Sequence, residues 1–258
     1  MTERTFLDEI ASASPTVSRG FQLSPQHKSL AGPSFLLCVL LSIGALLEVA
    51  SVGASLGYIS FFEQILNGGF TSENEVVEAG TSLDNFSMYL GFTAIGVFAL
   101  TVVAYCVFVY RAASNIHRSN ARGMTTSPGW AVGWSFIPFV NLVKIYEVMR
   151  DVWQSSHDPV RGAISPPAIL GPWWGCYLVG NILATISGRL QDSILLSDEF
   201  NADLMNFTLW LTIISSILSL IAVVLLFLIV RSITRAQANW TARSLGPARD
   251  DTLVAAPV

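Results

Sequence analysis

The sequence predicts an all-α integral membrane protein with four transmembrane helices arranged as two hairpins, plus a re-entrant or interfacial segment and an in-plane amphipathic helix. Three observations lead to this fold class. Of the 258 residues, 52% are hydrophobic and only 12% are charged, which is about half the charge of an ordinary soluble domain. The apolar residues fall in long blocks. The charged residues lie almost entirely between these blocks, as expected for membrane-spanning helices.

Four apolar blocks are long enough to cross a bilayer as helices, which takes about 20 residues at about 1.5 Å rise per residue. The first block contains one charged residue, Glu48, and the other three contain none. Helices are expected because the backbone polar groups of a spanning segment must find partners inside the membrane. The expected spans are residues 34–62, 86–110, 168–188 and 206–230.

A fifth apolar stretch, residues 127–155, is expected to dip into the membrane rather than cross it. Its charge-free part has 17 residues, and Pro138 interrupts a helix by removing an N–H and clashing with the preceding turn. Beyond Pro138, polar and apolar residues alternate at spacings of three and four. This pattern predicts an amphipathic helix in the plane of the interface, with its apolar face in lipid. Asn141 is expected to cap that helix through its side chain.

The distribution of charge predicts the topology. If the fifth stretch only dips, one side of the membrane holds both ends of the chain and residues 111–167, with 13 of the 14 Lys and Arg. The other side holds two loops with nine acidic residues and Arg189. The positive-inside rule then predicts a multi-pass protein of the cell (plasma) membrane with both termini cytoplasmic. The net charge of −4 gives no reason to expect a nucleic-acid partner.

Both ends of the chain are expected to be disordered cytoplasmic tails, flanking a membrane domain over residues 34–240. Residues 1–33 are rich in Ser, Thr and Pro without helical periodicity, and residues 241–258 are similar. A cleavable signal peptide ending near residues 52–54 is the alternative for the N-terminal part. The long preceding region and the continuing apolar run argue against that alternative.

Glu48 is the strongest candidate for an intramembrane site. It lies 14 residues from either end of its apolar block, hence near the middle of the bilayer. An ionised carboxylate there costs roughly 2.5–3.5 kcal/mol on insertion scales, so we expect the neutral acid. A functional proton or cation site is one interpretation, and a neutral carboxyl that merely joins helices is the other. The polar partners available on other segments are uncharged: Asn141, Asn181, Ser215, Ser216 and Ser219.

The sequence lacks the patterns of soluble catalysis. Its three histidines are far apart, and its three cysteines lie singly in apolar runs without metal-ligand or disulfide spacing. It also lacks a Gly-rich phosphate loop and a nucleophile elbow. We therefore expect a non-enzymatic protein without cofactor or metal. Gly-xxx-Gly patterns at 53–57 and 171–175 predict close helix packing, within the chain or in a homo-oligomer.

A long motif runs through the middle of the chain and continues near its end. The motif residues are Arg111, Asn115, Pro128, Gly129, Trp130, Trp134, Pro138, Tyr146, Trp173 and Trp174, followed by Ile233-Thr234-Arg235 and Gln237. This pattern resembles the bacterial membrane family called domain of unknown function 4328, over roughly residues 36–237. One departure is Lys144-Ile145, where a proline next to Tyr146 is expected. The resemblance implies a multi-span bacterial membrane protein and no assigned activity.

Basic residues follow two of the spans and are expected to face anionic lipid headgroups. They are Arg111, Arg118, Arg122, Arg231 and Arg235. Our main hypothesis is a protein that scaffolds, senses or regulates a membrane-protein partner, or a second copy of itself, at the cytoplasmic face. The alternative is a small transporter or channel that uses Glu48 and the broken segment 127–141. A mid-membrane polar cavity touching both of these would favour transport, and a solid apolar core would favour the scaffold.

Overall fold

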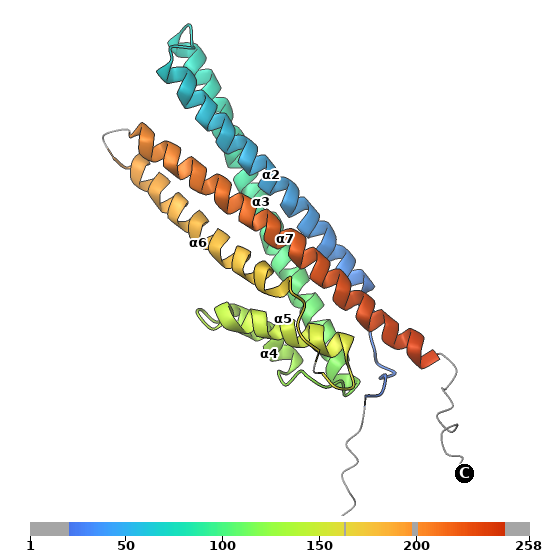
Figure 1. The fold of residues 1–258 in the computed structure, drawn as a ribbon. Helices are drawn as coiled ribbons and strands as arrows, with labels where there is room; N and C mark the ends of the chain where they lie inside the picture. The colour runs from blue at the N-terminus through green and yellow to red at the C-terminus, as the bar shows by residue number, and fades with distance from the viewer. Residues whose placement is uncertain (1–20, 163, 198–200, 246–258) are drawn as a thin grey trace, which may run out of the picture.

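The computed structural model describes residues 21–162, 164–197 and 201–245, which form helices and connecting loops without any strand. Four long helices make an elongated bundle (Figure 1): α2 (Ala31–Leu66), α3 (Glu73–Arg118), α6 (Leu170–Leu195) and α7 (Ala202–Leu245). Between α3 and α6 lie α4 (Pro128–Gly133), the 3-10 helix η1 (Trp134–Phe136) and α5 (Asn141–His157). Each predicted apolar block falls on one long helix, to within two residues.

Helices α2 and α7 form the middle of the bundle. α2 packs against α3 and α7, and α7 also packs against α6. At about 1.5 Å per residue, the 46 residues of α3 extend about 69 Å, whereas the 26 residues of α6 extend about 39 Å. The α2–α3 hairpin projects well beyond the neighbouring ends of α6 and α7 (Figure 1).

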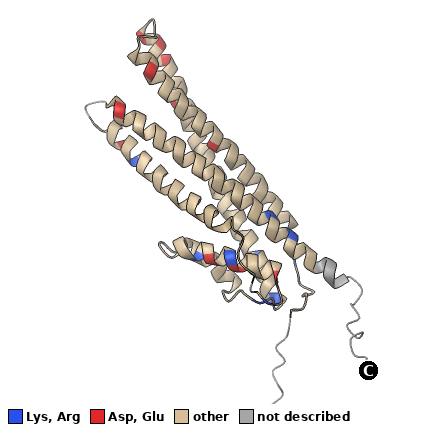
Figure 2. Ribbon diagram, in the orientation of Figure 1, with Lys and Arg blue, Asp and Glu red and all other residues tan. Residues whose placement is uncertain are grey.

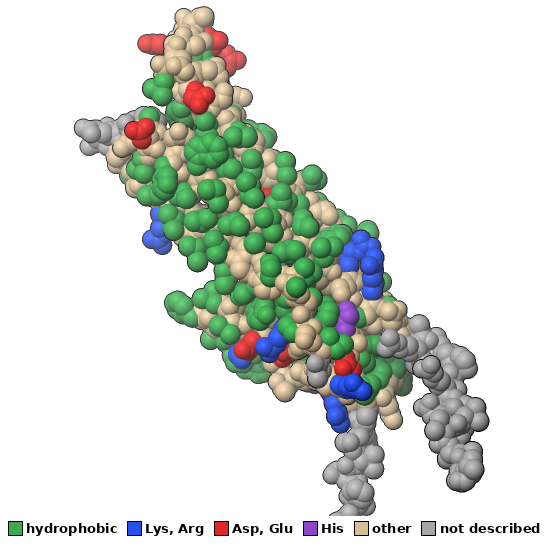
Figure 3. Space-filling view, viewed as in Figure 1, with side chains coloured by type: hydrophobic (Ala, Val, Ile, Leu, Met, Phe, Trp, Pro, Cys, Tyr) green, Lys and Arg blue, Asp and Glu red, His purple; other side chains and the backbone are tan. Residues whose placement is uncertain are grey.

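Three helices are long and apolar enough to cross a membrane, namely α2, α3 and residues 202–240 of α7. Their large apolar side chains point outward: Phe35, Phe92 and Ile95 are 72%, 70% and 67% exposed. Apolar side chains cover the middle of the molecule (Figure 3), which indicates a surface made for lipid rather than water. α6 is long enough to cross but is less apolar than these three helices, since Gly, Trp and Asn residues interrupt its apolar run.

Charged side chains gather toward the two ends of the bundle (Figure 2). The acidic end is the turn between α2 and α3, with Glu63, Glu73, Glu75 and Glu78. The basic end is the opposite end, where Lys28, Arg111, Arg118, Arg231 and Arg235 lie. At the acidic end the Ser72 hydroxyl caps α3 by accepting from the Glu75 N–H at 3.3 Å, as serine does at many helix starts.

The tightest core lies at the basic end, where α3, α5 and α7 meet. Phe108, Ile116, Met149, Val152 and Ile233 are all completely buried there. These residues come from three helices that are distant in sequence, so this core joins the two halves of the chain.

The packing of α5 corrects the expectation that its apolar face lies in lipid. That face, including Met149 and Val152, is buried against α3 and α7. The reason is that α3 and α7 continue past their apolar blocks and offer a protein surface at this level. Only the beginning of α5 exposes large apolar side chains, Leu142 and Val143.

Residues 21–30 also depart from expectation, because they pack along the basic end instead of forming part of a disordered tail. Leu30 is buried, and the Phe21 ring lies 5.2 Å from the Trp240 ring. The Gln22 N–H donates to the Ser119 carbonyl at 3.0 Å. Composition alone did not reveal these contacts, since the partners lie on α3 and α7. At the other end, α7 continues to Leu245, and residues 1–20 and 246–258 lie outside the described residues.

The loop after α3 touches the loop after α5. The Arg122 N–H donates to the Pro159 carbonyl at 2.9 Å. Gly162 has φ of +65°, and a Cβ at this position would lie 2.6 Å from the Arg122 backbone. Only glycine fits such a conformation and approach without strain.

Candidate functional site

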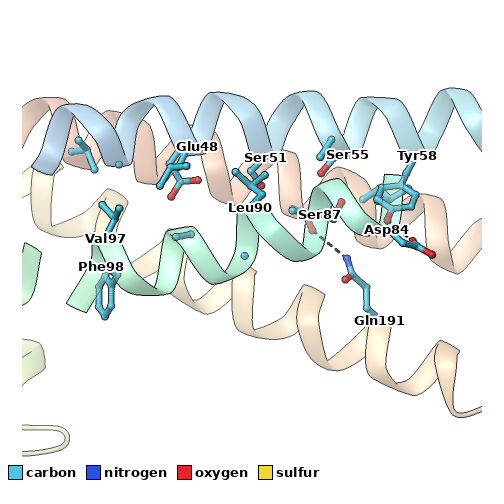
Figure 4. A pocket seen from close by; sticks show the side chains of 18 of the residues that line it. Glu48, Ser51, Ser55, Tyr58, Asp84, Ser87, Leu90, Val97, Phe98 and Gln191 are labelled. Atoms are coloured by element: carbon cyan, nitrogen blue, oxygen red, sulfur yellow. Dashed lines mark hydrogen bonds between the residues drawn. The ribbon is translucent and has the colours of Figure 1, made fainter. Parts of the chain in front are cut away.

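A cleft of about 800 Å³ opens along the bundle between α2, α3 and α7, with Gln191 of α6 at its edge. It reaches from Leu40 to Phe62 along α2. Glu48 lies on the α2 wall of this cleft and is half-buried (Figure 4). The cleft therefore combines a carboxyl on a long apolar helix with space next to it.

The polar side chains of α2 follow the cleft at helical spacing. Glu48, Ser51, Ser55 and Tyr58 are separated by three, four and three residues, which places them on one face of the helix. All four line the cleft (Figure 4). α2 thus presents a polar stripe to the cavity.

The groups next to Glu48 are neutral. The Ser216 and Ser219 side chains of α7 lie close to its carboxyl. The described residues that line the cleft include no Lys, Arg or His. A carboxyl with hydroxyl partners and no fixed cation is suited to exchanging a proton or holding a small cation.

The polar lining continues toward the acidic end. The Tyr58 hydroxyl donates to Asp84 Oδ1 at 2.6 Å, joining α2 to α3. Ser87 lies one turn further along α3 and also lines the cleft. With Ser51 and Ser55, these groups line the cavity between exposed Asp84 and half-buried Glu48.

Unlike the cleft, the interface between α6 and α7 is closely packed. The Ser187 hydroxyl donates to the Thr208 carbonyl at 2.9 Å and lies 2.7 Å from Thr212 Oγ1. A Cβ on Gly180 would lie 3.4 Å from the Ser215 carbonyl oxygen, so the two backbones approach closely there. Small and hydroxylated residues thus close this interface, as is usual between membrane helices.

The other two residues of the predicted intramembrane site do not lie in the cleft. Asn181 is exposed, and its side-chain amide donates to the Tyr177 carbonyl of its own helix at 2.7 Å. Asn141 lies toward the basic end as the first residue of α5. The N-cap of α5 is Val140 and no side chain caps it, so the expected capping by Asn141 is wrong. Glu48, Asn141 and Asn181 therefore do not form one site.

A buried network of amides and hydroxyls connects four parts of the chain at the basic end. Asn115 accepts from the Lys28 N–H at 3.0 Å and donates to the Lys28 carbonyl at 2.8 Å. It also donates to Gln237 Oε1 at 2.9 Å. Gln237 in turn donates to the Ala112 carbonyl at 3.2 Å and to the Ser156 hydroxyl at 3.0 Å. We call Asn115, Ser156 and Gln237 the amide network.

The Ser-Pro-Gly-Trp motif forms the start of α4. Ser127 is its N-cap and accepts from the Trp130 N–H at 3.5 Å, with Pro128 as the first helical residue and Gly129 as the second. Proline suits that position because its missing N–H would have no helical partner. The Trp130 and Trp134 rings contact each other, with centroids 4.7 Å apart.

The remaining motif residues connect α4, α5 and α6. Pro138 lies in the turn between η1 and α5, and Tyr146 is half-buried on α5. Trp174 donates through Nε1 to the Leu142 carbonyl at 2.8 Å, which joins α6 to α5. Trp173 and Trp174 are buried, so they differ from the tryptophans of an exposed interfacial belt.

The two predicted basic exits have different surroundings. Arg111 and Arg118 line a groove of about 390 Å³ together with Lys28. Arg231 and Arg235 are exposed on α7, and the Arg231 guanidinium lies 5.5 Å from the Phe227 ring centre. Arg122 is part of the loop that touches Pro159.

His157 is a titratable group in the core of the basic end. Its Nδ1 lies 2.8 Å from the Trp153 carbonyl and must carry the proton, so Nε2 accepts from the Ser232 hydroxyl at 3.0 Å. Burial lowers the pKa of His157, and the hydrogen bond to Trp153 opposes this effect only in part. Burial also lowers the pKa of His27. Both histidines therefore favour the neutral form in the folded protein.

Several site residues were missed in the sequence. The stripe of Ser51, Ser55 and Tyr58 could have been found by testing α2 for polar residues at spacings of three and four from Glu48. Ser156 and the backbone of Lys28 carried no such signal, because their partners are far away in the chain. Within the described residues, no three His, Cys, Asp or Glu side chains cluster in a way that could hold a metal ion.

No curated protein and no solved structure matches this chain. A family model described as Domain of unknown function (DUF4328) matches residues 74–235. The match covers more than half of the chain, from the start of α3 to the last part of α7, and includes the motif residues from Arg111 to Arg235. The chain belongs to the DUF4328 family.

Proposed function

We propose that the chain crosses the cell membrane four times, as the hairpins α2–α3 and α6–α7, with both termini in the cytoplasm. α6 lies beside α7 in the bundle (Figure 1), and about 39 Å of helix exceeds the roughly 30 Å of a hydrocarbon core. Contact with α7 covers part of its surface, so α6 needs less lipid-facing apolar surface than a lone helix. The positive-inside rule makes the basic end cytoplasmic.

The segment between the hairpins is proposed to enter the interface without crossing it. Trp130, Phe136, Phe139 and Leu142 are exposed at the start of this segment, while the later part of α5 packs on α3 and α7. Exposed aromatic and aliphatic side chains at this level are suited to the headgroup boundary.

Reporter fusions test this topology. A reporter active only outside the cytoplasm is expected to be inactive when fused after Arg161 or after Val258, and active when fused after Asp192. An inactive reporter after Asp192 would contradict a membrane crossing by α6. An active reporter after Val258 would place the C-terminus outside the cytoplasm.

For the function, we propose a non-enzymatic protein that scaffolds, senses or regulates a membrane-protein partner, or a second copy of the chain, at its cytoplasmic face. The observation that carries this proposal is the exposed pair Arg231 and Arg235, four residues apart on α7 next to the rigid amide network. Neither arginine forms a salt bridge within the described residues. Unpaired cations on a fixed helix are suited to an acidic partner surface.

Affinity capture in mild detergent followed by mass spectrometry tests this function. A defined partner is expected with the wild-type protein and with the control variant Arg189→Gln. Arg189 lies in the second half of α6, away from Arg231 and Arg235. The double variant R231Q/R235Q is expected to lose that partner. Equal recovery with both variants would contradict a role of this face in binding.

The cleft supports a second candidate function, a small transporter or channel. It provides about 800 Å³ beside Glu48 and a polar lining toward the acidic end. The broken segment 127–141 does not line it, so transport would depend on α2, α3 and α7 instead. In vesicles with an imposed pH gradient, the wild-type protein and Glu63→Gln are expected to dissipate the gradient, whereas Glu48→Gln is not. Equal rates for Glu48→Gln and wild type would exclude this function for the carboxyl.

A further inference from the structure

We infer that the groove at the basic end binds the headgroup of one anionic phospholipid, with an acyl chain along α3. The groove lies between the segment before α2, the last part of α3 and the beginning of α4. It is separate from the Glu48 cleft, since the two share no lining residue. Its lining combines cationic residues with apolar ones, as phospholipid binding requires.

The cations converge from two parts of the chain. Arg111 and Arg118 are seven residues apart and lie on one face of α3, and Lys28 lines the groove from the preceding segment. None of the described lining residues is acidic. The positive charge of the groove is therefore not compensated from within it, which favours a phosphate group.

The fold holds the backbone of Lys28 and the guanidinium of Arg118 in place. Both backbone polar groups of Lys28 are bonded to the buried Asn115 side chain, at 3.0 and 2.8 Å. The Arg118 guanidinium donates to the Gln26 carbonyl at 3.3 Å. A guanidinium that is already ordered, as that of Arg118 is, loses less side-chain entropy on binding than a flexible surface side chain does.

The apolar part of the groove distinguishes a lipid from a free anion. Cys106, Val107 and Tyr110 precede Arg111 on α3, toward the middle of the bundle, and Val132 of α4 faces the same groove. Further along α3, Leu100 and Val103 are exposed on the apolar part of the helix. An acyl chain that leaves the headgroup site can follow this surface, whereas free phosphate would gain nothing from it.

Native mass spectrometry of the full-length protein in detergent, titrated with phosphatidylglycerol or phosphatidylcholine, tests the inference. The wild-type protein is expected to bind one phosphatidylglycerol at least ten times more tightly than phosphatidylcholine. R111Q/R118Q is expected to lose this preference, and the matched control R122Q/R161Q, at two exposed arginines that do not line the groove, is expected to keep it. Should the double variant fail to fold, the single variant Arg118→Gln, at an exposed position, is expected to weaken the preference at least threefold.

Two outcomes would overturn the inference. The first is equal binding of both lipids, or an equal loss of preference in the groove variant and in the control. An equal loss would mean that anionic lipid is attracted to basic surface in general. The second is competition by glycerophosphoglycerol, the headgroup without chains, at the concentration at which the intact lipid competes. That result would assign a free-anion site, so the expected result is no competition at that concentration.

Discussion

The amide network and the Glu48 cleft both place polar side chains between packed helices, α3 and α7 among them, but only the cleft leaves open space beside these side chains. In the network, the side-chain nitrogen and oxygen of Asn115 and of Gln237 all have hydrogen-bond partners, and both residues are completely buried. In the cleft, Glu48 and the polar stripe line a cavity of about 800 Å³. One arrangement is closed and the other is open.

This difference separates structural polar residues from candidates for function. A satisfied buried network fixes the positions of its members, and removing one leaves the others unpaired. Polar groups beside a cavity can change partners or take up a ligand without disrupting the fold. We therefore expect substitutions in the network to reduce stability and substitutions in the cleft to change reactivity or activity.

Asn115→Ala is expected to have the largest effect on stability. It leaves the Lys28 backbone and Gln237 Oε1 without partners in a buried site, and each lost partner costs about 1–3 kcal/mol. We expect the free energy of unfolding to fall by about 3 kcal/mol in total, measured by thermal or denaturant unfolding in detergent. Asn181→Ala is the matched control, since Asn181 is exposed and bonds only to its own helix. Similar losses of unfolding free energy in Asn115→Ala and Asn181→Ala would contradict a special structural role of the amide network.

Gly162→Ala is expected to be the next most destabilising change. The added Cβ meets the Arg122 backbone at 2.6 Å with φ at +65°, and a left-handed conformation costs alanine about 1–2 kcal/mol even without a clash. Unfolding in detergent should show a loss of about 2 kcal/mol. Gly129→Ala is the control, because nothing lies within 4 Å of the added atom. An unchanged stability of the Gly162 variant would show that the two loops do not need this contact.

Glu48→Gln is expected to change the free energy of unfolding by less than about 1 kcal/mol and to abolish labelling by a membrane-soluble carbodiimide. A membrane-soluble carbodiimide reacts with the acid form of carboxyls in apolar surroundings, and Glu48 lies beside an open cavity. Mass spectrometry should find one labelled carboxyl in the wild type and in Glu63→Gln, and none in Glu48→Gln. Labelling that persists in Glu48→Gln would mean that the cleft does not expose this carboxyl.

The smallest expected effect concerns pH. Burial lowers the pKa of His157 and His27 in the folded protein, so the unfolded chain binds more protons as the pH falls through about 6.5. Stability is therefore fully present above that pH and declines below it. His157→Gln should reduce the difference in unfolding temperature between pH 7.5 and pH 5.5. An identical pH dependence in this variant and the wild type would rule out His157 as a contributor.

Much of the fold could be predicted from the sequence. The apolar blocks predicted the four long helices, and three of these are long and apolar enough to cross a membrane. The resemblance carried by the motif from Arg111 to Trp174 is confirmed by the family match. These features depend on local composition and short spacings, which a sequence displays directly.

The site was less predictable. Of the three α7 serines named as possible partners of Glu48, Ser216 and Ser219 lie close to its carboxyl, whereas the Ser215 hydroxyl donates to the Thr212 carbonyl. Asn181 was grouped with Glu48 on depth and Asn141 on its place in the broken segment 127–141, yet neither determines which face of a helix turns inward. α6 lies beside α7 and borders the cleft at Gln191, whereas Asn181 does not line it and is exposed.

The sequence by itself determined the class of protein, the helices and the separation of charge between the two ends, because each follows from hydrophobicity and charge along the chain. Only the tertiary structure decided that residues 21–30 pack on the bundle, that α5 buries its apolar face in protein, and that Asn115 meets Gln237 across 122 positions. Contacts of this kind depend on how helices dock, and docking is set by side chains that are far apart in the sequence.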